Sequence, residues 1–135
     1  MGDKCVINFR GGEYALFKDL FLDWSYWEQA IRMMRTKGVS DFEVHTDDPE
    51  LAKKFFPWFD VISNPTISHS LNANMGYNWR ALRYAKHIIL SNSSFGILPA
   101  LLNENAYVIA PRYWARHNIK QWVLPANYYS KFKYI

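Results

Sequence analysis

Apolar and polar positions form blocks along the chain, and the blocks alternate between two patterns. Short apolar runs flanked by turn residues predict strands; these runs are residues 5–9, 42–46, 60–63, 87–90 and 107–110. The segments between them carry apolar residues three or four positions apart, which predicts helices; they are residues 25–37, 49–55, 78–86 and 95–103. Apolar strands alternating with helices predict an α/β domain with a parallel sheet covered on both faces.

Capping residues support the first two helices. Ser25 followed three positions later by Glu28 forms a capping-box pattern, which predicts a helix beginning there. Gly38 fits the left-handed position that follows a helix. Asp48 before Pro49 predicts a second helix start, because proline suits the first helical position and aspartate caps it.

Three other stretches interrupt this pattern. Residues 63–77 are rich in Asn, Ser, Pro and Gly and predict a long loop. Pro99 stands inside the last predicted helix and is expected to kink it. Residues 111–135 are aromatic, basic and irregular, and we expect them to pack on the domain formed by residues 4–110. The whole chain, 1–135, has the length of a single domain.

The predicted topology places four stretches at one edge of the sheet. In open parallel sheets, ligands bind beyond the carboxyl ends of the strands. The stretches that follow predicted strands are residues 10–14, 47–48, 91–94 and 111–112. If the sheet is parallel, they form one rim, and candidate ligand groups are to be sought there.

The turn at Ser93 and Ser94 has the chemistry of a phosphate site. Small polar residues between a strand and a helix offer two hydroxyls, free backbone N–H groups and the positive end of the helix. An ordinary serine N-cap has the same sequence. The turn therefore indicates a phosphate only together with other groups.

Arg10 is the second candidate at the rim. A guanidinium at a strand end can grip a diphosphate with two parallel hydrogen bonds, and Gly11 and Gly12 would let a ligand approach the backbone. The alternative is a solvated arginine beside a turn. No Gly-Lys-Ser/Thr follows, so this is not a Walker loop.

Asp47 and Asp48 could bind a ribose, a base amine or a cation, although capping by one of them before Pro49 is the simpler interpretation. Four histidines lack the spacing of metal ligands, and no cysteine cluster accompanies them; they are His45, His69, His87 and His117. No metal site is therefore expected.

Composition narrows the choice of partners. The net charge of +4 favours anionic ligands, but no Lys/Arg-rich run predicts binding to nucleic acid. No apolar run is long enough for a transmembrane segment, and the first residues do not form a signal peptide. The single cysteine, Cys5, lies in an apolar strand and is expected in the core. These features favour a cytoplasmic protein, and its 24 aromatic residues leave room for a partner face.

In this order, the motifs resemble the donor-binding half of family 11 (α-1,2-fucosyltransferase-like) glycosyltransferases. The family's His-x-Arg-Arg-Gly-Asp-Tyr motif corresponds to residues 8–14, and its Ser/Thr-Asp-Asp stretch corresponds to residues 46–48. Its hydrophobic strand with Asn-Ser-Ser-Phe corresponds to residues 88–95, and its Ile-Ala-Pro strand end to residues 109–111. The resemblance covers most of the chain.

The resemblance implies a Rossmann-like half of a GT-B fold that binds GDP-fucose and transfers the sugar to a glycan acceptor with inversion. Arg10 would hold the β-phosphate and assist its departure, and Glu13 is the candidate general base. The donor would be lined by Asn8, Asp47, Asp48, Asn78, Ser93, Ser94 and Phe95. Arginine and helix-end amides can stabilise a departing diphosphate without a metal, so no cofactor is implied beyond the donor substrate.

Departures from the family pattern leave alternatives open. Asn8 replaces the motif histidine and Gly11 replaces its second arginine. An enzyme of this kind would be about twice as long, so the chain would be a fragment, a subunit that needs a partner, or a remnant that no longer catalyses. The alternative function is a non-catalytic assembly module that forms a homo- or hetero-oligomer. A generic Rossmann-like domain for another nucleotide is a third reading.

Overall fold

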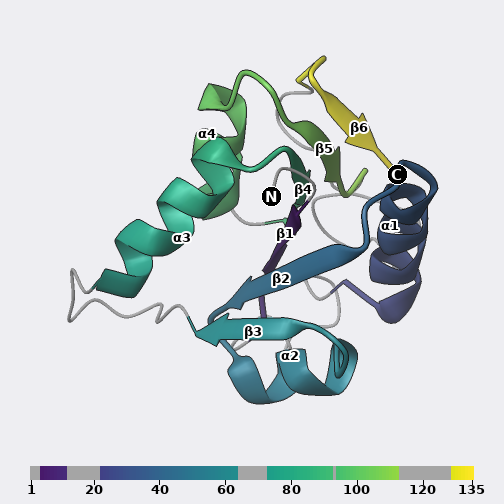
Figure 1. Ribbon diagram of the computed structural model, residues 1–135, viewed down its shortest axis with the longest axis vertical. Coiled ribbons are helices and arrows are strands. Elements are labelled where there is room, and N and C mark those ends of the chain that lie inside the picture. The colour runs from purple at the N-terminus through teal and green to yellow at the C-terminus, as the bar shows by residue number, and fades with distance from the viewer. Residues whose placement is uncertain (1–3, 12–21, 64–72, 93, 113–128) are drawn as a thin grey trace.

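The computed structural model describes residues 4–11, 22–63, 73–92, 94–112 and 129–135 (Figure 1). Along the chain its elements are β1 (Lys4–Phe9), α1 (Trp24–Thr36), β2 (Asp41–Thr46), α2 (Pro49–Phe55), β3 (Asp60–Ser63), α3 (Ala73–Tyr84), β4 (His87–Ile89), α4 (Ser94–Leu102), β5 (Tyr107–Ala110) and β6 (Phe132–Tyr134). The alternation predicted from the sequence is therefore present.

All the described strands join one parallel sheet in the order β3-β2-β1-β4-β5-β6. The order grows outward from β1 to one edge and from β4 to the other, so the direction of winding reverses between β1 and β4. This reversal is the topological switch point of a Rossmann-like sheet, beside which such folds bind their ligands. The prediction of an α/β parallel sheet is confirmed.

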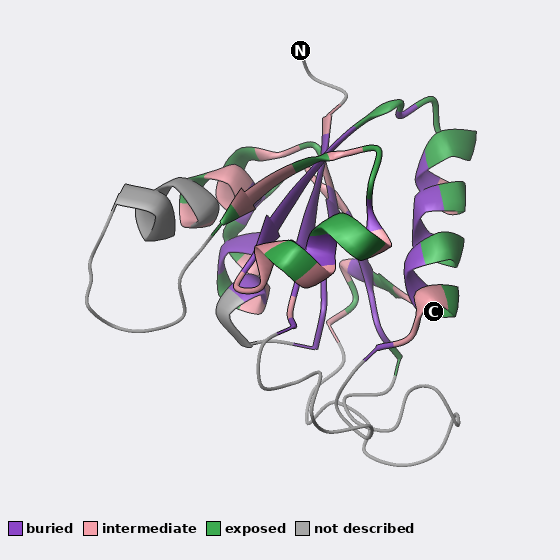
Figure 2. Cartoon of the chain, turned by 90° about the horizontal axis from the view of Figure 1, so that it is seen from below, coloured by how far each residue is buried: buried purple, intermediate pink, exposed green. Residues whose placement is uncertain are grey.

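Helices cover both faces of the sheet. One face of the sheet packs with α1 and α2 through a cluster that includes Trp27, Met34 and Phe56. The other face packs with α3 and α4 through a cluster that includes Leu82 and Ala100. In Figure 2 the strands between these layers are mostly buried, and α1 is buried on its inner side and exposed on its outer side.

Both ends of α1 can be compared with the sequence prediction. Gly38 has φ 92° and donates its N–H to the carbonyl of Arg35, while Val39 donates to Met34. These two bonds form a Schellman motif, so the prediction for Gly38 is confirmed. The predicted N-cap at Ser25 is wrong by two residues: Asp23 is the N-cap, and the Ser25 hydroxyl donates to its carboxylate.

Two boundaries differ more from the prediction. Residues 63–77 are predicted to form a loop, but α3 already begins at Ala73, so the low helix propensity of Gly76 does not prevent the helix. The expected irregular tail contains β6, which pairs with β5 at the edge of the sheet. In β6 Phe132 is buried and Lys133 is exposed, which is the alternation of a half-buried strand.

The helix α4 continues through Pro99 to Leu102, so it does not end at the proline. It lies beside α3 on the same face of the sheet (Figure 1). Within the described ranges, no helix combines the length and the apolar character that crossing a bilayer requires.

Candidate functional site

The parallel sheet brings the predicted rim together at one edge. Arg10 follows β1, Asp47 follows β2, Ser91 comes two residues after β4, and Arg112 comes two residues after β5. Since parallel strands end at the same edge, the described residues of the four stretches share one rim, as the sequence predicted. Within it, β1 and β4 are hydrogen-bonded neighbours, so the switch point lies in the middle of the rim.

Arg10 and Asp47 face each other across the ends of β1 and β2. The guanidinium Nε lies 3.1 Å from Asp47 Oδ2, and the Gly11 N–H donates to Asp47 Oδ1 at 2.8 Å. The side chain of Asp47 is only 6% exposed, while that of Arg10 is 22% exposed. One carboxylate therefore joins the two strand ends, with a hydrogen bond to Gly11 and an ion pair to Arg10.

Asp48 has a different contact. Its carboxylate accepts a hydrogen bond from the Leu51 N–H at 3.2 Å, and its own N–H donates to the Thr46 hydroxyl at 2.9 Å. It is the N-cap of α2, as the interpretation of Asp48 before Pro49 predicts. Its assignment to the donor stays a prediction, because this cap explains the residue without a ligand.

Asn8 lies at the switch point itself. Its side-chain oxygen accepts a hydrogen bond from the Ser91 hydroxyl at 3.0 Å, which ties β1 to the chain leaving β4. Both residues are buried. The helix α4 presses on this pair, because a Cβ added to Gly96 would stand 2.9 Å from Asn8 Nδ2. Asn8 thus links the ends of β1 and β4 beside the rim and lies close to α4, and its assignment to the donor stays a prediction.

Gly96→Ala is expected to destabilise the protein by about 1 to 3 kcal/mol, the usual cost of overpacking. The added methyl group would meet Asn8 and also the Leu90 side chain at 3.1 Å, so α4 must shift. Urea unfolding measures the effect. The control is Leu98→Ala, which changes an exposed residue of the same helix and should therefore cost far less stability. Equal costs would contradict the close approach.

Tyr26 supports the rim from the other face of the sheet. Its hydroxyl donates to the carbonyl of Leu90 at 2.5 Å, directly after β4. Burial raises the pKa of Tyr26, so the phenol keeps the proton that it donates. This contact fixes the residue that precedes Ser91.

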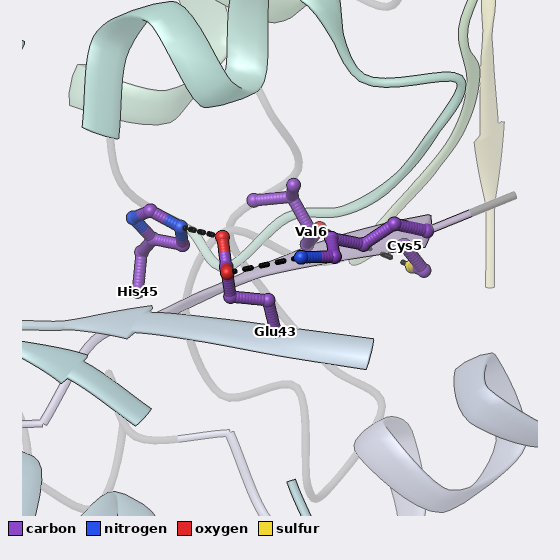
Figure 3. A network of polar contacts seen from close by, with 5 residues as sticks. Cys5, Val6, Glu43 and His45 are labelled. Carbon is purple, nitrogen blue, oxygen red and sulfur yellow. Dashed lines mark hydrogen bonds and ion pairs between the residues drawn. The ribbon is translucent and has the colours of Figure 1, made fainter. Parts of the chain in front are cut away.

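The sequence did not predict a buried polar cluster that lies on β1 and β2. His45 Nε2 lies 2.8 Å from Glu43 Oε1, and Lys4 Nζ lies 3.3 Å from Glu43 Oε2 (Figure 3). In the sheet register His45 is paired with Asn8, so this group extends from the switch point along β2. The spacing of Glu43 and His45 by two in a predicted strand places them on one face, and that signal was available.

Burial and charge set the protonation of this group. Burial lowers the pKa of His45 from 6.5, and the opposing effect of Glu43 does not compensate. Burial alone would raise the pKa of Glu43, but its contacts with His45 and Lys4 lower it from 4.5. At neutral pH the pair is therefore a carboxylate and a neutral imidazole, with Nε2–H donating to the carboxylate.

The protein is expected to lose stability as the pH falls below 6.5. Because the pKa of His45 is lower in the folded state, the unfolded chain binds more protons between that value and 6.5. The loss can reach about 1.4 kcal/mol per pH unit. Below pH 4.5, protonation of Glu43 adds a second loss of the same sign.

Urea midpoints at pH 7.5 and 5.5 test this, with His45→Gln as the comparison. The substitution removes the titrating group, so the midpoint of the variant should change less between the two pH values. A wild-type midpoint that stays constant, or a variant that falls as steeply, would contradict the assignment.

The remaining candidate residues are not all described. Glu13 and Ser93 lie outside the described residues. Asn78 lies in α3, and Ser94 and Phe95 begin α4, but only their places in these helices are described. Among the residues that the structure does describe, no cluster of His, Cys, Asp or Glu could hold a metal ion.

Strand order, layers and rim define a Rossmann-like α/β domain of the kind that forms one half of a GT-B glycosyltransferase. Among solved structures, the chain is similar to E. coli heptosyltransferase WaaC with ADP, with a TM-score of 0.55 and 16% sequence identity. The match covers 98% of this chain and 37% of that chain. No family model matches the chain, and the search of curated proteins found no similar sequence. The likeness therefore establishes the fold.

Proposed function

We propose that the chain is a glycosyltransferase domain that binds a nucleotide sugar at the rim between β1 and β4. The observation that carries the proposal is the position of Arg10, which Asp47 holds at the carboxyl end of β1, next to the switch point. The fold supports it, because the similar heptosyltransferase was solved with ADP. A nucleoside diphosphate is the part that this ligand shares with a nucleotide-sugar donor.

An arginine side chain and the beginning of a helix would together hold the diphosphate. Arg10 brings a permanent positive charge and a planar fork of donors. Across the switch point, α4 begins at Ser94, and the first N–H groups of a helix have no partner within the helix. Their dipoles favour an anion at this end. Both groups would stabilise the charge that develops on the departing diphosphate, which makes transfer possible without a metal.

We assign the donor more narrowly as GDP-fucose, transferred with inversion. This rests on the resemblance of residues 8–14 and 88–95 to family 11 fucosyltransferases. Under it, Asn78 would contact the guanine, Ser93, Ser94 and Phe95 the phosphate and ribose, and Glu13 would act as the base toward a glycan acceptor. Since the chain spans 37% of the length of the heptosyltransferase chain, the acceptor site is expected on another segment or subunit.

Thermal unfolding with added nucleotides tests the proposal. A ligand that binds only the native state at a hundred times its Kd stabilises it by about 2.7 kcal/mol, which raises the melting temperature by several degrees. We expect GDP and GDP-fucose to produce this shift and ADP a smaller one. Equal shifts with GDP and ADP would reject the fucosyl assignment. No shift with any nucleoside diphosphate at millimolar concentration would reject the nucleotide-sugar site.

A further inference from the structure

The N–H groups at the end of β1 already bind an anionic side chain of the protein itself, the Asp47 carboxylate. Asp47 receives the Gly11 N–H on one carboxylate oxygen at 2.8 Å and lies 3.1 Å from the Arg10 Nε with the other. A backbone amide and a guanidinium converging on two oxygens of one group is the arrangement that binds a phosphate at a strand-to-helix turn. Here a side chain from the end of β2 takes that position.

The position is built into the packing of the two turns. A Cβ added to Gly11 would lie 2.9 Å from the Cβ of Asp48, so the backbone after β1 can approach the β2 turn only because residue 11 is glycine. Asp48 is in turn fixed as the cap of α2 through the Leu51 N–H. The neighbouring carboxylate of Asp47 is therefore delivered to Gly11 and Arg10 by a rigid turn and is itself largely buried.

This use of Asp47 differs from that in dinucleotide-binding sheets. There, the acid at the end of the second strand hydrogen-bonds a ribose hydroxyl, while the turn after the first strand holds the pyrophosphate. In this chain the acid and the first turn bind each other. A ligand phosphate at the same turn would be repelled by the Asp47 carboxylate. The phosphate would therefore bind more favourably nearer the beginning of α4.

We infer that Asp47 is an internal counter-anion that occupies the phosphate position of the β1 turn and weakens the binding of free anions to Arg10. An anion that binds Arg10 must share it with this carboxylate or displace the carboxylate from it. The inference deepens the proposed function, since it concerns the arginine assigned to the donor diphosphate. Its test needs no nucleotide.

Calorimetric titration of the full chain with inorganic pyrophosphate and with inorganic phosphate tests this. Asp47→Asn keeps an oxygen that can accept from the Gly11 N–H but removes the charge. We expect pyrophosphate to bind the variant about tenfold more tightly or better, because a like charge beside a bound anion is strongly unfavourable. Unchanged or weaker binding by the folded variant would overturn the inference.

Asp48→Asn is the matched control, since it removes the same charge from the same turn and asparagine caps a helix as well as aspartate does. An equal gain in this variant would also overturn the inference, because it would reflect net charge alone. Asp47→Ser, checked by thermal unfolding, provides a second removal of the charge if the asparagine variant does not fold.

The two proposals fail in different ways. Absence of a GDP-induced shift in the wild type would reject the nucleotide-sugar site, but Asp47→Asn would still be expected to gain pyrophosphate affinity. Conversely, GDP binding to the wild type combined with a loss of pyrophosphate affinity in Asp47→Asn would make Asp47 a clamp that positions Arg10. That result would reject the counter-anion and leave the donor site in place.

Discussion

Asn103→Ala is expected to lower the free energy of unfolding by about 4 kcal/mol, because the side chain makes four hydrogen bonds, buried or partly buried, worth about 1 kcal/mol each. Its Nδ2 donates to the carbonyls of Leu82 and Ala85, at 3.0 Å and 2.7 Å. Its Oδ1 accepts from the N–H groups of Asn105 and Ala106, at 2.9 Å and 3.0 Å. One asparagine thus joins the end of α3 to the turn between α4 and β5.

The loss is large because Asn103 is almost fully buried, so alanine would leave four backbone groups without their partner. Asn103→Asp separates the two halves of the interaction: it keeps the acceptor for both N–H groups but places a carboxylate against two carbonyls. Asn105→Ala is the control, since that side chain is exposed and the hydrogen bond to Asn103 uses the backbone N–H of Asn105. Urea unfolding of the three variants measures the difference. A cost below about 1 kcal/mol for Asn103→Ala would contradict the four-bond account.

Arg10→Ala is expected to weaken GDP binding by about 10- to 100-fold, since a hydrogen bond to a charged group contributes about 1.5 to 3 kcal/mol. In the proposed site the guanidinium faces the diphosphate while Asp47 holds it at Nε. The substitution also leaves the buried Asp47 carboxylate without its counter-charge, which adds repulsion toward the ligand. Isothermal calorimetry with GDP measures the change.

Arg32→Ala provides the comparison, because it removes the same charge from an exposed position on α1, where Arg32 pairs with Glu28 at 3.7 Å. Its effect on GDP affinity should be small at physiological salt, where charges beyond about 8 Å are screened. Thermal unfolding separates a loss of binding from a loss of folding. Equal affinities of wild type and Arg10→Ala would remove the arginine from the site.

The sequence predicted much of this fold because parallel strands buried on both faces are apolar throughout. Apolar runs such as residues 5–9 and 107–110 coincide with strands within a residue, and Pro49 marks the observed start of α2. The start of α3 was missed because Gly76 resembles a turn residue and has low helix propensity. The strand β6 was missed because three residues carry too little pattern.

Site prediction succeeded at the level of the rim and stopped at the level of contacts. Topology places Arg10 and Asp47 at neighbouring strand ends, and a sequence pattern suffices to infer that. The contacts of Asp47 with Arg10 and Gly11 were not predicted. They depend on the close approach of two turns, which no local sequence pattern encodes. The burial of His45 beside Glu43 likewise depends on which face α3 and α4 cover.

The central claim is that a nucleoside diphosphate binds at the rim beside the switch point, and NMR titration tests it most directly. The chain of 16.0 kDa suits backbone amide spectra. On addition of GDP, the largest shifts are predicted at the amides of Gly11, Ser91 and Gly96, around the carboxyl ends of β1 and β4. The amides of Asp41 and Tyr107, at the opposite ends of β2 and β5, should stay unchanged. Saturable shifts confined to that opposite edge, or no saturable shifts at millimolar GDP, would contradict the account.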